Sequence, residues 1–143
     1  MIFKNRQEAG KKLAKLLLKY EGPDTVVLAL PRGGVVIGYE VANSLKLPLD
    51  IVVPRKIGAP GNPEYAIGAI TENGEGIFNP SEVELVDQKW LKERIAEEKK
   101  EIERRLQLYR EKEKEINLEN KTVIMVDDGI ATGYTISVAV RYV

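Results

Sequence analysis

The chain has 143 residues, which suits one compact domain and is too short for two full ones. Lys and Arg number 22 together, as do Asp and Glu, so the net charge is zero and no nucleic-acid partner is indicated. Cysteine and histidine are absent, which excludes thiolate zinc sites, cysteine nucleophiles and imidazole bases but leaves oxygen-ligated Mg²⁺ as a suitable cation.

The sequence predicts neither a membrane segment nor a secretory signal. It contains no run of eighteen apolar residues, and its first six residues, MIFKNR, lack the apolar core of a signal peptide. We therefore expect a cytoplasmic protein without a membrane partner.

The first third of the chain predicts helix, strand and helix in turn. Residues 5–20 form a helix with Asn5 as its N-cap. Residues 25–30, TVVLAL, form a continuous apolar run, which is typical of a strand buried on both faces of a parallel sheet. After a turn at 31–34, residues 35–46 carry apolar side chains at helical spacing and should pack back on that sheet.

The next segment predicts a second strand, an irregular loop and a hairpin. Residues 49–53 are mostly apolar, and residues 54–63 hold three prolines and two glycines, so we expect a long mobile loop there. Residues 65–71 and 76–78 flank the pair Asn73-Gly74, which is a strong signal for an antiparallel hairpin.

The remainder predicts a long charged helix, a strand and a short helix. Residues 87–114 carry apolar residues near the helical period, which indicates a solvated helix with one buried stripe rather than a coiled coil, since the heptad is not sustained. Residues 121–126, KTVIMV, form another buried strand, and a helix runs from about residue 136 to the end. The alternation predicts a single α/β domain with a parallel sheet, interrupted by the hairpin and the long helix.

The most specific segment runs from Asp127 to Thr135, directly after the last predicted strand. Ligands bind at the carboxyl ends of parallel strands, and adjacent carboxylates on Asp127 and Asp128 can accept hydrogen bonds from the 2′ and 3′ hydroxyls of a ribose. The next residues, ATGYT at 131–135, offer backbone amides and hydroxyls at a helix N-terminus, which suits a phosphate. Together they indicate a ribose 5-phosphate, whereas Asp-Asp-Gly alone would more often be a turn with a helix cap.

This segment resembles the phosphoribosyl-diphosphate signature of the type I phosphoribosyltransferases, and two other segments match that family in order. Residues 30–34, LPRGG, resemble its diphosphate loop, in which paired glycines let backbone amides approach an anion. Arg55-Lys56 and the residues after them resemble its flexible catalytic loop, the alternative being a solvated pair on a disordered loop. The resemblance implies a Rossmann-like topology for the parallel sheet.

The resemblance also implies a reaction and its residues. A nitrogen nucleophile, usually a base, would displace Mg²⁺-bound diphosphate from C1 of phosphoribosyl diphosphate, with Mg²⁺ held near Asp127 and Asp128 through substrate oxygens and water rather than directly by protein ligands. The expected catalytic residues are Arg55, Lys56, Asp127 and Asp128. The expected substrate-binding residues are Arg32, Gly33, Gly34, Asp127, Asp128, Gly129, Ala131, Thr132, Gly133, Tyr134 and Thr135.

Three features depart from the family pattern. Ala131 stands where the 6-oxopurine branch carries an Asp, so the chain is more similar to branches without that Asp, above all a subfamily of unassigned substrate. Tyr134 is bulkier than the usual Gly. The chain stops at Val143, before the further strands of family members, so we expect either a shortened chain or a partner chain that covers the sheet edge.

Two alternatives stay open beside the enzyme. One is a non-catalytic module that senses phosphoribosyl diphosphate or a nucleotide, and the other is an inert truncated product whose base pocket is missing. The retained Arg55-Lys56 pair and the acidic pair favour the enzyme. The identity of the base is not predicted, and the frequent dimers of the family make a homodimer the expected assembly.

Overall fold

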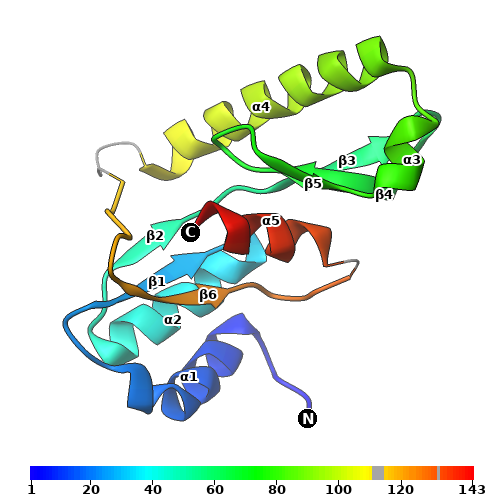
Figure 1. Cartoon of the computed structure of the whole chain (residues 1–143). Helices are drawn as coiled ribbons and strands as arrows, with labels where there is room; N and C mark the ends of the chain where they lie inside the picture. The colour runs from blue at the N-terminus through cyan, green and yellow to red at the C-terminus, as the bar shows by residue number, and fades with distance from the viewer. Residues whose placement is uncertain (111–114, 132) are drawn as a thin grey trace. The chain divides into compact units, whose positions relative to one another are not determined.

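The computed structural model of the chain describes residues 1–110, 115–131 and 133–143 (Figure 1). These residues cluster into two compact units. Unit 1 comprises residues 1–52 and 115–129, and unit 2 comprises residues 53–110 with the described residues from 130 to 143. The single domain expected from the sequence stays a prediction.

Unit 1 contains a parallel sheet of three strands in the order β2-β1-β6. The central strand β1 (Thr25–Ala29) pairs with β2 (Leu49–Ile51) on one side and with β6 (Thr122–Val126) on the other. All five residues of β1 are buried, as its continuous apolar run predicts. The predicted parallel sheet is therefore confirmed, and the three strands lie within the ranges that the sequence indicated.

Two helices of unit 1 pack against each other, and α2 (Gly33–Leu45) also packs on the sheet. Helix α1 (Arg6–Leu16) begins after Asn5, whose Oδ1 accepts a 2.8 Å hydrogen bond from the backbone N–H of Glu8, as expected of an N-cap. A single 3₁₀ turn, η1 (Leu18–Tyr20), follows α1. Burial of each large apolar side chain in the shared core contributes about 1.5–3 kcal/mol. That core consists of Ala14, Val27, Ile37, Val41, Ala42, Leu45, Ile124 and Val126.

Unit 2 contains an antiparallel sheet in the order β3-β4-β5. Strand β4 (Asn62–Ile70) pairs with β5 (Gly76–Phe78) around a turn in which Gly74 has a φ of +76°, so the predicted hairpin is confirmed. The prediction of an irregular loop at residues 54–63 is wrong, because residues 55–59 form a strand, β3 (Arg55–Ala59), which pairs with β4.

The prolines of that segment lie where a strand tolerates them. Pro54 precedes β3, Pro60 lies in the turn, and Pro63 stands opposite an irregularity in the β3–β4 pairing around Gly58. A Cβ at Gly58 would overlap the backbone of Pro63, so glycine is required for this close approach. The proline and glycine content therefore marked a bulged hairpin rather than an unstructured loop.

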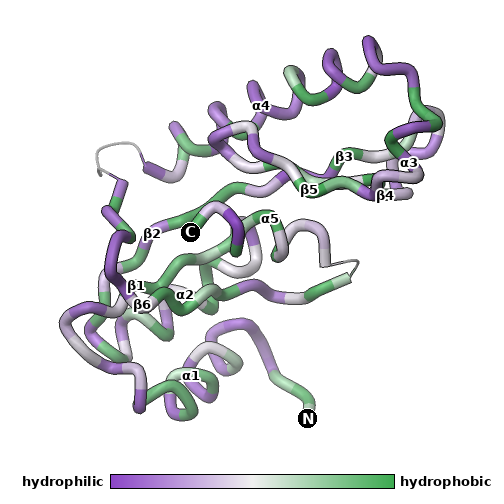
Figure 2. Tube along the Cα trace, viewed as in Figure 1, coloured by the Kyte–Doolittle hydropathy of each residue, from purple (hydrophilic) through white to green (hydrophobic). Residues whose placement is uncertain are grey.

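Three helices complete unit 2. Helix α4 (Gln88–Arg110) packs against β3 and β4, and Figure 2 shows that most of its length is hydrophilic. It confirms the long charged helix as far as Arg110; residues 111–114 of that prediction lie outside the described residues. The last helix, α5 (Tyr134–Tyr142), is also confirmed and packs on β4, β5 and β3.

The short helix α3 (Pro80–Glu84) was not predicted. Asn79 caps it by accepting a 3.2 Å hydrogen bond from the backbone N–H of Ser81, and Pro80 occupies its first turn. No helix in the described part of the chain is long and apolar enough to cross a membrane.

Candidate functional site

The acidic pair of the sequence motif lies at the carboxyl end of β6 in unit 1. Asp127 directly follows the last residue of the strand, Val126, and is partly buried, while Asp128 is exposed. The backbone N–H of Asp128 donates a 2.8 Å hydrogen bond to Oδ1 of Asp127. The two carboxylates thus occupy the edge of the sheet where ligands of open parallel sheets bind.

Arg6, at the start of α1, forms an ion pair with Asp128 across 122 residues of sequence. Its NH2 and Nε atoms donate to the same oxygen, Oδ2, at 2.7 and 3.2 Å. The hydrogen bond from Arg6 lowers the pKa of Asp128, whereas burial raises the pKa of Asp127. Sequence reasoning missed Arg6, because no local pattern connects it with the acidic pair.

The paired glycines of the predicted diphosphate loop lie against the acidic pair. Gly33 and Gly34 begin α2, and a Cβ at Gly33 would overlap the carboxylate of Asp128. A Cβ at Gly34 would lie 2.8 Å from the carbonyl oxygen of Val126. Gly34 thus allows the backbone at the end of β6 to approach, and Gly33 leaves room for the Asp128 carboxylate, reasons that the sequence did not reveal.

The N-terminus of α2 lies beside the acidic pair and has no side-chain cap. Arg32 is the N-cap residue, it is exposed, and its side chain makes no capping hydrogen bond. The first amide groups of a helix carry the positive end of its dipole, which favours a bound anion. Unit 1 thus brings together a helix N-terminus, two glycines and two carboxylates.

A hollow of about 440 Å³ opens beside the acidic pair. Its walls are mainly apolar, and its polar groups come from Asn5, Arg6 and the two acids. A pocket of this kind suits a small organic group with a few polar atoms. It is lined by Phe3, Asn5, Arg6, Ala9, Leu13, Ile37, Asp127 and Asp128.

The predicted phosphate-binding residues occupy the start of α5. Gly133 is the N-cap and has a φ of +85°, a left-handed conformation that glycine adopts without strain. Tyr134 and Thr135 form the first turn of α5, which has no side-chain cap. Ala131 is exposed, and Thr132 lies outside the described residues. Ala131, Gly133, Tyr134 and Thr135 belong to unit 2, whereas Gly129, which is exposed, belongs to unit 1.

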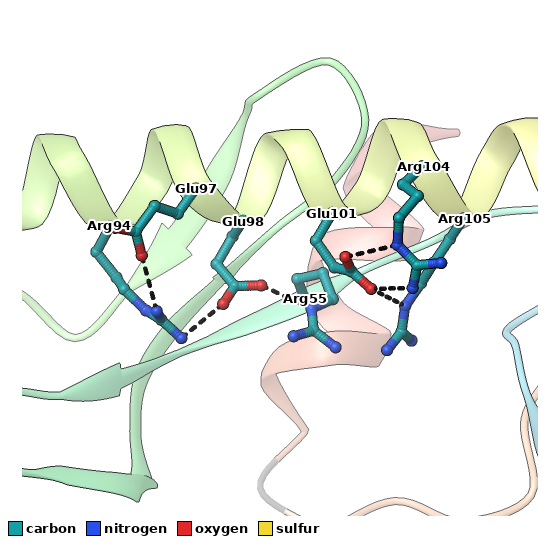
Figure 3. A network of polar contacts seen from close by, with 7 residues as sticks. All are labelled: Arg55, Arg94, Glu97, Glu98, Glu101, Arg104 and Arg105. Carbon is teal, nitrogen blue, oxygen red and sulfur yellow. Dashed lines mark hydrogen bonds and ion pairs between the residues drawn. The ribbon is translucent and has the colours of Figure 1, made fainter.

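Arg55 and Lys56 lie at the start of β3 in unit 2 and are paired with acidic side chains. Nε of Arg55 donates a 2.6 Å hydrogen bond to Oε2 of Glu98 on α4, as Figure 3 shows. Nζ of Lys56 lies 3.2 Å from Oε2 of Glu64, and both of these side chains are exposed. The catalytic role of the two cations stays a prediction.

The carboxylates of Asp127 and Asp128 suit a cation that takes most of its ligands from other molecules. Within residues 1–110, 115–131 and 133–143, no three acidic side chains converge as a metal cage. Two carboxylates supply hard oxygen donors, which Mg²⁺ accepts together with water and phosphate oxygens. The two carboxylates therefore suit a Mg²⁺ ion that takes its other ligands from water or a bound molecule.

Comparison with known families gives a match over the whole chain. The family described as "Phosphoribosyl transferase domain" matches residues 1–143. The chain belongs to the phosphoribosyl transferase family. The resemblance of the chain to the type I phosphoribosyltransferases is thereby confirmed, and so is membership of a transferase family.

Relatives of this phosphoribosyl transferase chain include proteins of Mycobacterium tuberculosis and Thermus thermophilus. Two proteins of Mycobacterium tuberculosis, from strains CDC 1551 and H37Rv, are each named "putative phosphoribosyl transferase" and are 41% identical over 140 residues. The alignments cover 96% of this chain but 32% of each relative, so the chain spans about a third of their length.

A solved structure from the second bacterium, Thermus thermophilus, shares the fold. The crystal structure of its protein TT1426 superposes with a TM-score of 0.79 at 41% identity, covering 98% of this chain and 67% of that one. This similarity and the family match confirm the α/β class with the topology of a type I phosphoribosyltransferase.

Proposed function

We propose that the chain transfers a phosphoribosyl group from phosphoribosyl diphosphate to a nitrogen nucleophile, which we take to be a base, and releases diphosphate. The observation that carries this proposal is the convergence in unit 1 of Gly33 and Gly34 on Asp127 and Asp128 at the end of β6. Anion-binding amides and a diol-binding carboxylate pair are the two groups that this donor needs at adjacent positions.

The acidic pair would hold the ribose. The 2′ and 3′ hydroxyls of the donor would donate hydrogen bonds to Asp127 and Asp128. Both hydrogen bonds from Arg6 go to Oδ2 of Asp128, so Oδ1 is left to accept from a hydroxyl. A hydrogen bond to an ionised carboxylate contributes about 1.5–3 kcal/mol, so this contact would fix the sugar firmly.

Cationic and amide groups would hold the anionic ends of the donor. Arg32 and the amides that begin α2 would bind the diphosphate, and Arg55 and Lys56 would stabilise its charge as the bond to C1 breaks. The amides of Gly133 and Thr135, with the threonine hydroxyls, would bind the 5′-phosphate. A bound Mg²⁺ would neutralise the leaving diphosphate.

The chemistry needs no imidazole or thiol. The transition state is an oxocarbenium-like sugar between a departing anion and a neutral nucleophile, and catalysis depends on position and charge. The hollow beside the acidic pair, lined by apolar residues and Arg6, is the part of unit 1 that we propose for the nucleophile. Its chemistry does not select one base.

Diphosphate release tests the proposal. The chain is incubated with phosphoribosyl diphosphate, Mg²⁺ and a panel of purine, pyrimidine and pyridine bases, and diphosphate is measured with a coupled assay. We expect release with one class of base and none after addition of EDTA. The variant Asp127→Asn/Asp128→Asn controls for contaminating activity.

The other outcomes discriminate the alternatives. Tight binding of the donor in calorimetry without turnover on any base would replace the enzyme with a sensing module. Absence of donor binding by the wild-type chain would refute both and leave the inert product.

A further inference from the structure

One carboxylate of α4 departs from the solvated character of that helix. Glu98 is 4% exposed and lies on the same helix face as the buried Leu91 and Ile102, seven residues after the first and four before the second. These two apolar residues already dock α4 in unit 2. A carboxylate in their row therefore requires an explanation other than hydrophobic packing.

Both oxygens of Glu98 bind arginines from different elements. Oε2 accepts from Nε of Arg55 on β3 at 2.6 Å, and Oε1 accepts from NH2 of Arg94 on α4 at 2.7 Å (Figure 3). Arg94 in turn donates through NH1 to Oε2 of Glu97 at 3.0 Å. Glu98 is thus fixed at both oxygens and fixes Arg55 in turn.

The ion pair leaves the outer edge of the Arg55 guanidinium available. Nε is the atom that bonds Glu98, and Figure 3 shows the two terminal nitrogens pointing away from α4. Within the described residues these nitrogens donate no hydrogen bond, and the side chain is 30% exposed. The two terminal nitrogens form the edge with which a guanidinium binds a phosphate through two parallel hydrogen bonds.

The neighbouring Glu101 shows what a purely local ion pair on α4 looks like. Its oxygens accept from Arg104 at 2.6 and 2.9 Å and from Arg105 at 3.0 Å, all on the same helix (Figure 3). Its side chain is 29% exposed, against 5% for Glu98. Pairs like that of Glu101 are common on solvated helices and constrain no other element.

Burial makes stability a poor explanation for Glu98. Removing a carboxylate from water costs several kcal/mol, and apolar replacements of buried ion pairs are often neutral or stabilising. An apolar residue at this position would extend the row of Leu91 and Ile102. A buried carboxylate that orients an arginine is better explained by what the arginine does.

We propose that Glu98 is a positioning residue, which fixes the orientation of the Arg55 guanidinium and keeps its two terminal nitrogens free to bind the diphosphate of the donor. Arg94 fixes the second oxygen of Glu98 and so completes the support. This inference rests on the proposed function, since it assigns the diphosphate as the ligand of Arg55.

The test compares two ligands that differ in the diphosphate. Calorimetry measures the affinity of the chain for phosphoribosyl diphosphate and for ribose 5-phosphate, both with Mg²⁺. In Glu98→Gln we expect about a tenfold weaker affinity for the diphosphate compound, because one charge-assisted contact becomes misaligned. The affinity for ribose 5-phosphate should not change. The matched control Glu101→Gln should leave both affinities unchanged.

A second pair of variants separates orientation from stability. Arg55→Lys keeps the positive charge, but an ammonium has a single nitrogen and cannot bind Glu98 while presenting two further nitrogens to a phosphate. The variant should therefore weaken diphosphate binding about as much as Glu98→Gln does. Adding Glu98→Gln to Arg55→Lys should then cause no further loss, since the residues act through one contact. If Glu98→Gln does not fold, wild-type affinity in Arg55→Lys alone overturns the inference.

The remaining outcomes are decisive as well. Equal losses for both ligands in Glu98→Gln would indicate a structural role and overturn the inference, as would unchanged affinities. Both results leave the proposed function intact, because the wild-type chain still binds the donor. Failure of the wild-type chain to bind phosphoribosyl diphosphate would overturn the proposed function and this inference together.

Discussion

The two glycines that begin α2 should respond differently to the same substitution. A Cβ at Gly33 would overlap the carboxylate of Asp128, a side chain 36% exposed that can rotate away. A Cβ at Gly34 would lie 2.8 Å from the main-chain oxygen of Val126 and 3.1 Å from Cα of Asp127, neither of which can rotate. Gly33→Ala should therefore affect binding, and Gly34→Ala should affect stability.

The expected magnitudes follow from these contacts. Gly33→Ala gives up an exposed ion pair between Arg6 and Asp128 worth about 0–1 kcal/mol, and alanine in a helix offsets this by up to about 1 kcal/mol. The free energy of unfolding should thus change by less than about 1 kcal/mol. Displacement of the Asp128 carboxylate removes a charge-assisted hydrogen bond to the ribose, about 1.5–3 kcal/mol or roughly tenfold to 150-fold in donor affinity.

Gly34→Ala should lower stability. Forcing a methyl group against the backbone costs about 1–3 kcal/mol in the free energy of unfolding. Urea unfolding measures the stability of both variants, and calorimetry with phosphoribosyl diphosphate and Mg²⁺ measures binding. Gly22→Ala is the control, since its Cβ would meet nothing within 4 Å. Wild-type donor affinity in Gly33→Ala, or wild-type stability in Gly34→Ala, would refute this reasoning.

Three further predictions concern charge, turn and core. Arg6→Gln should raise the pKa of Asp128 toward its ordinary value, so on acidification the variant should lose donor affinity at a higher pH than the wild-type chain does. Carboxyl NMR and calorimetry across pH measure this, and an unchanged titration of Asp128 would contradict it. Gly74→Ala should lower the free energy of unfolding by about 1–2 kcal/mol because of its φ of +76°, as measured with urea. Ile102→Ala should lower it by about 2–5 kcal/mol, since the side chain is fully buried, and a smaller loss would mean that α4 packs loosely.

The direction of the Arg6 prediction follows from the sign of the shift. The folded-state pKa of Asp128 is depressed, so the stabilisation from its ionised form is present above the unfolded pKa and is lost as the pH falls through the folded value. Without the Arg6 hydrogen bond, that loss moves to higher pH. As a control, substitution of Lys12, whose ammonium pairs with Glu8, should leave the pKa of Asp128 unchanged.

The sequence predicted those elements whose signals are local. The run TVVLAL, the helical spacing after Gly34 and the strand before Asp127 each depend on neighbouring residues, and all three match the structure. The three site motifs also placed the chain in its family. In each case a few consecutive residues carried the information.

What the sequence did not reveal depends on distant partners. Strand β3 exists because β4 pairs with it across a bulge, which no count of prolines and glycines could show. The Arg6–Asp128 pair joins residues 122 apart, and Glu98 looked like one more charge on a solvated helix. Helix α3 is different, since Asn79-Pro80 is a local helix-start signal, yet no element was predicted at residues 80–84 from the sequence.

The position of β6 beside β1 has a consequence for how the chain acquires its fold. Residues 30–121 separate the two strands, so their parallel pairing closes a loop of about ninety residues. The hairpin of β4 and β5 with α4 joins residues close in sequence and should gain amide protection first. The acidic pair follows β6 and meets Gly33 only after that late pairing, so donor binding would report the completion of folding rather than its onset.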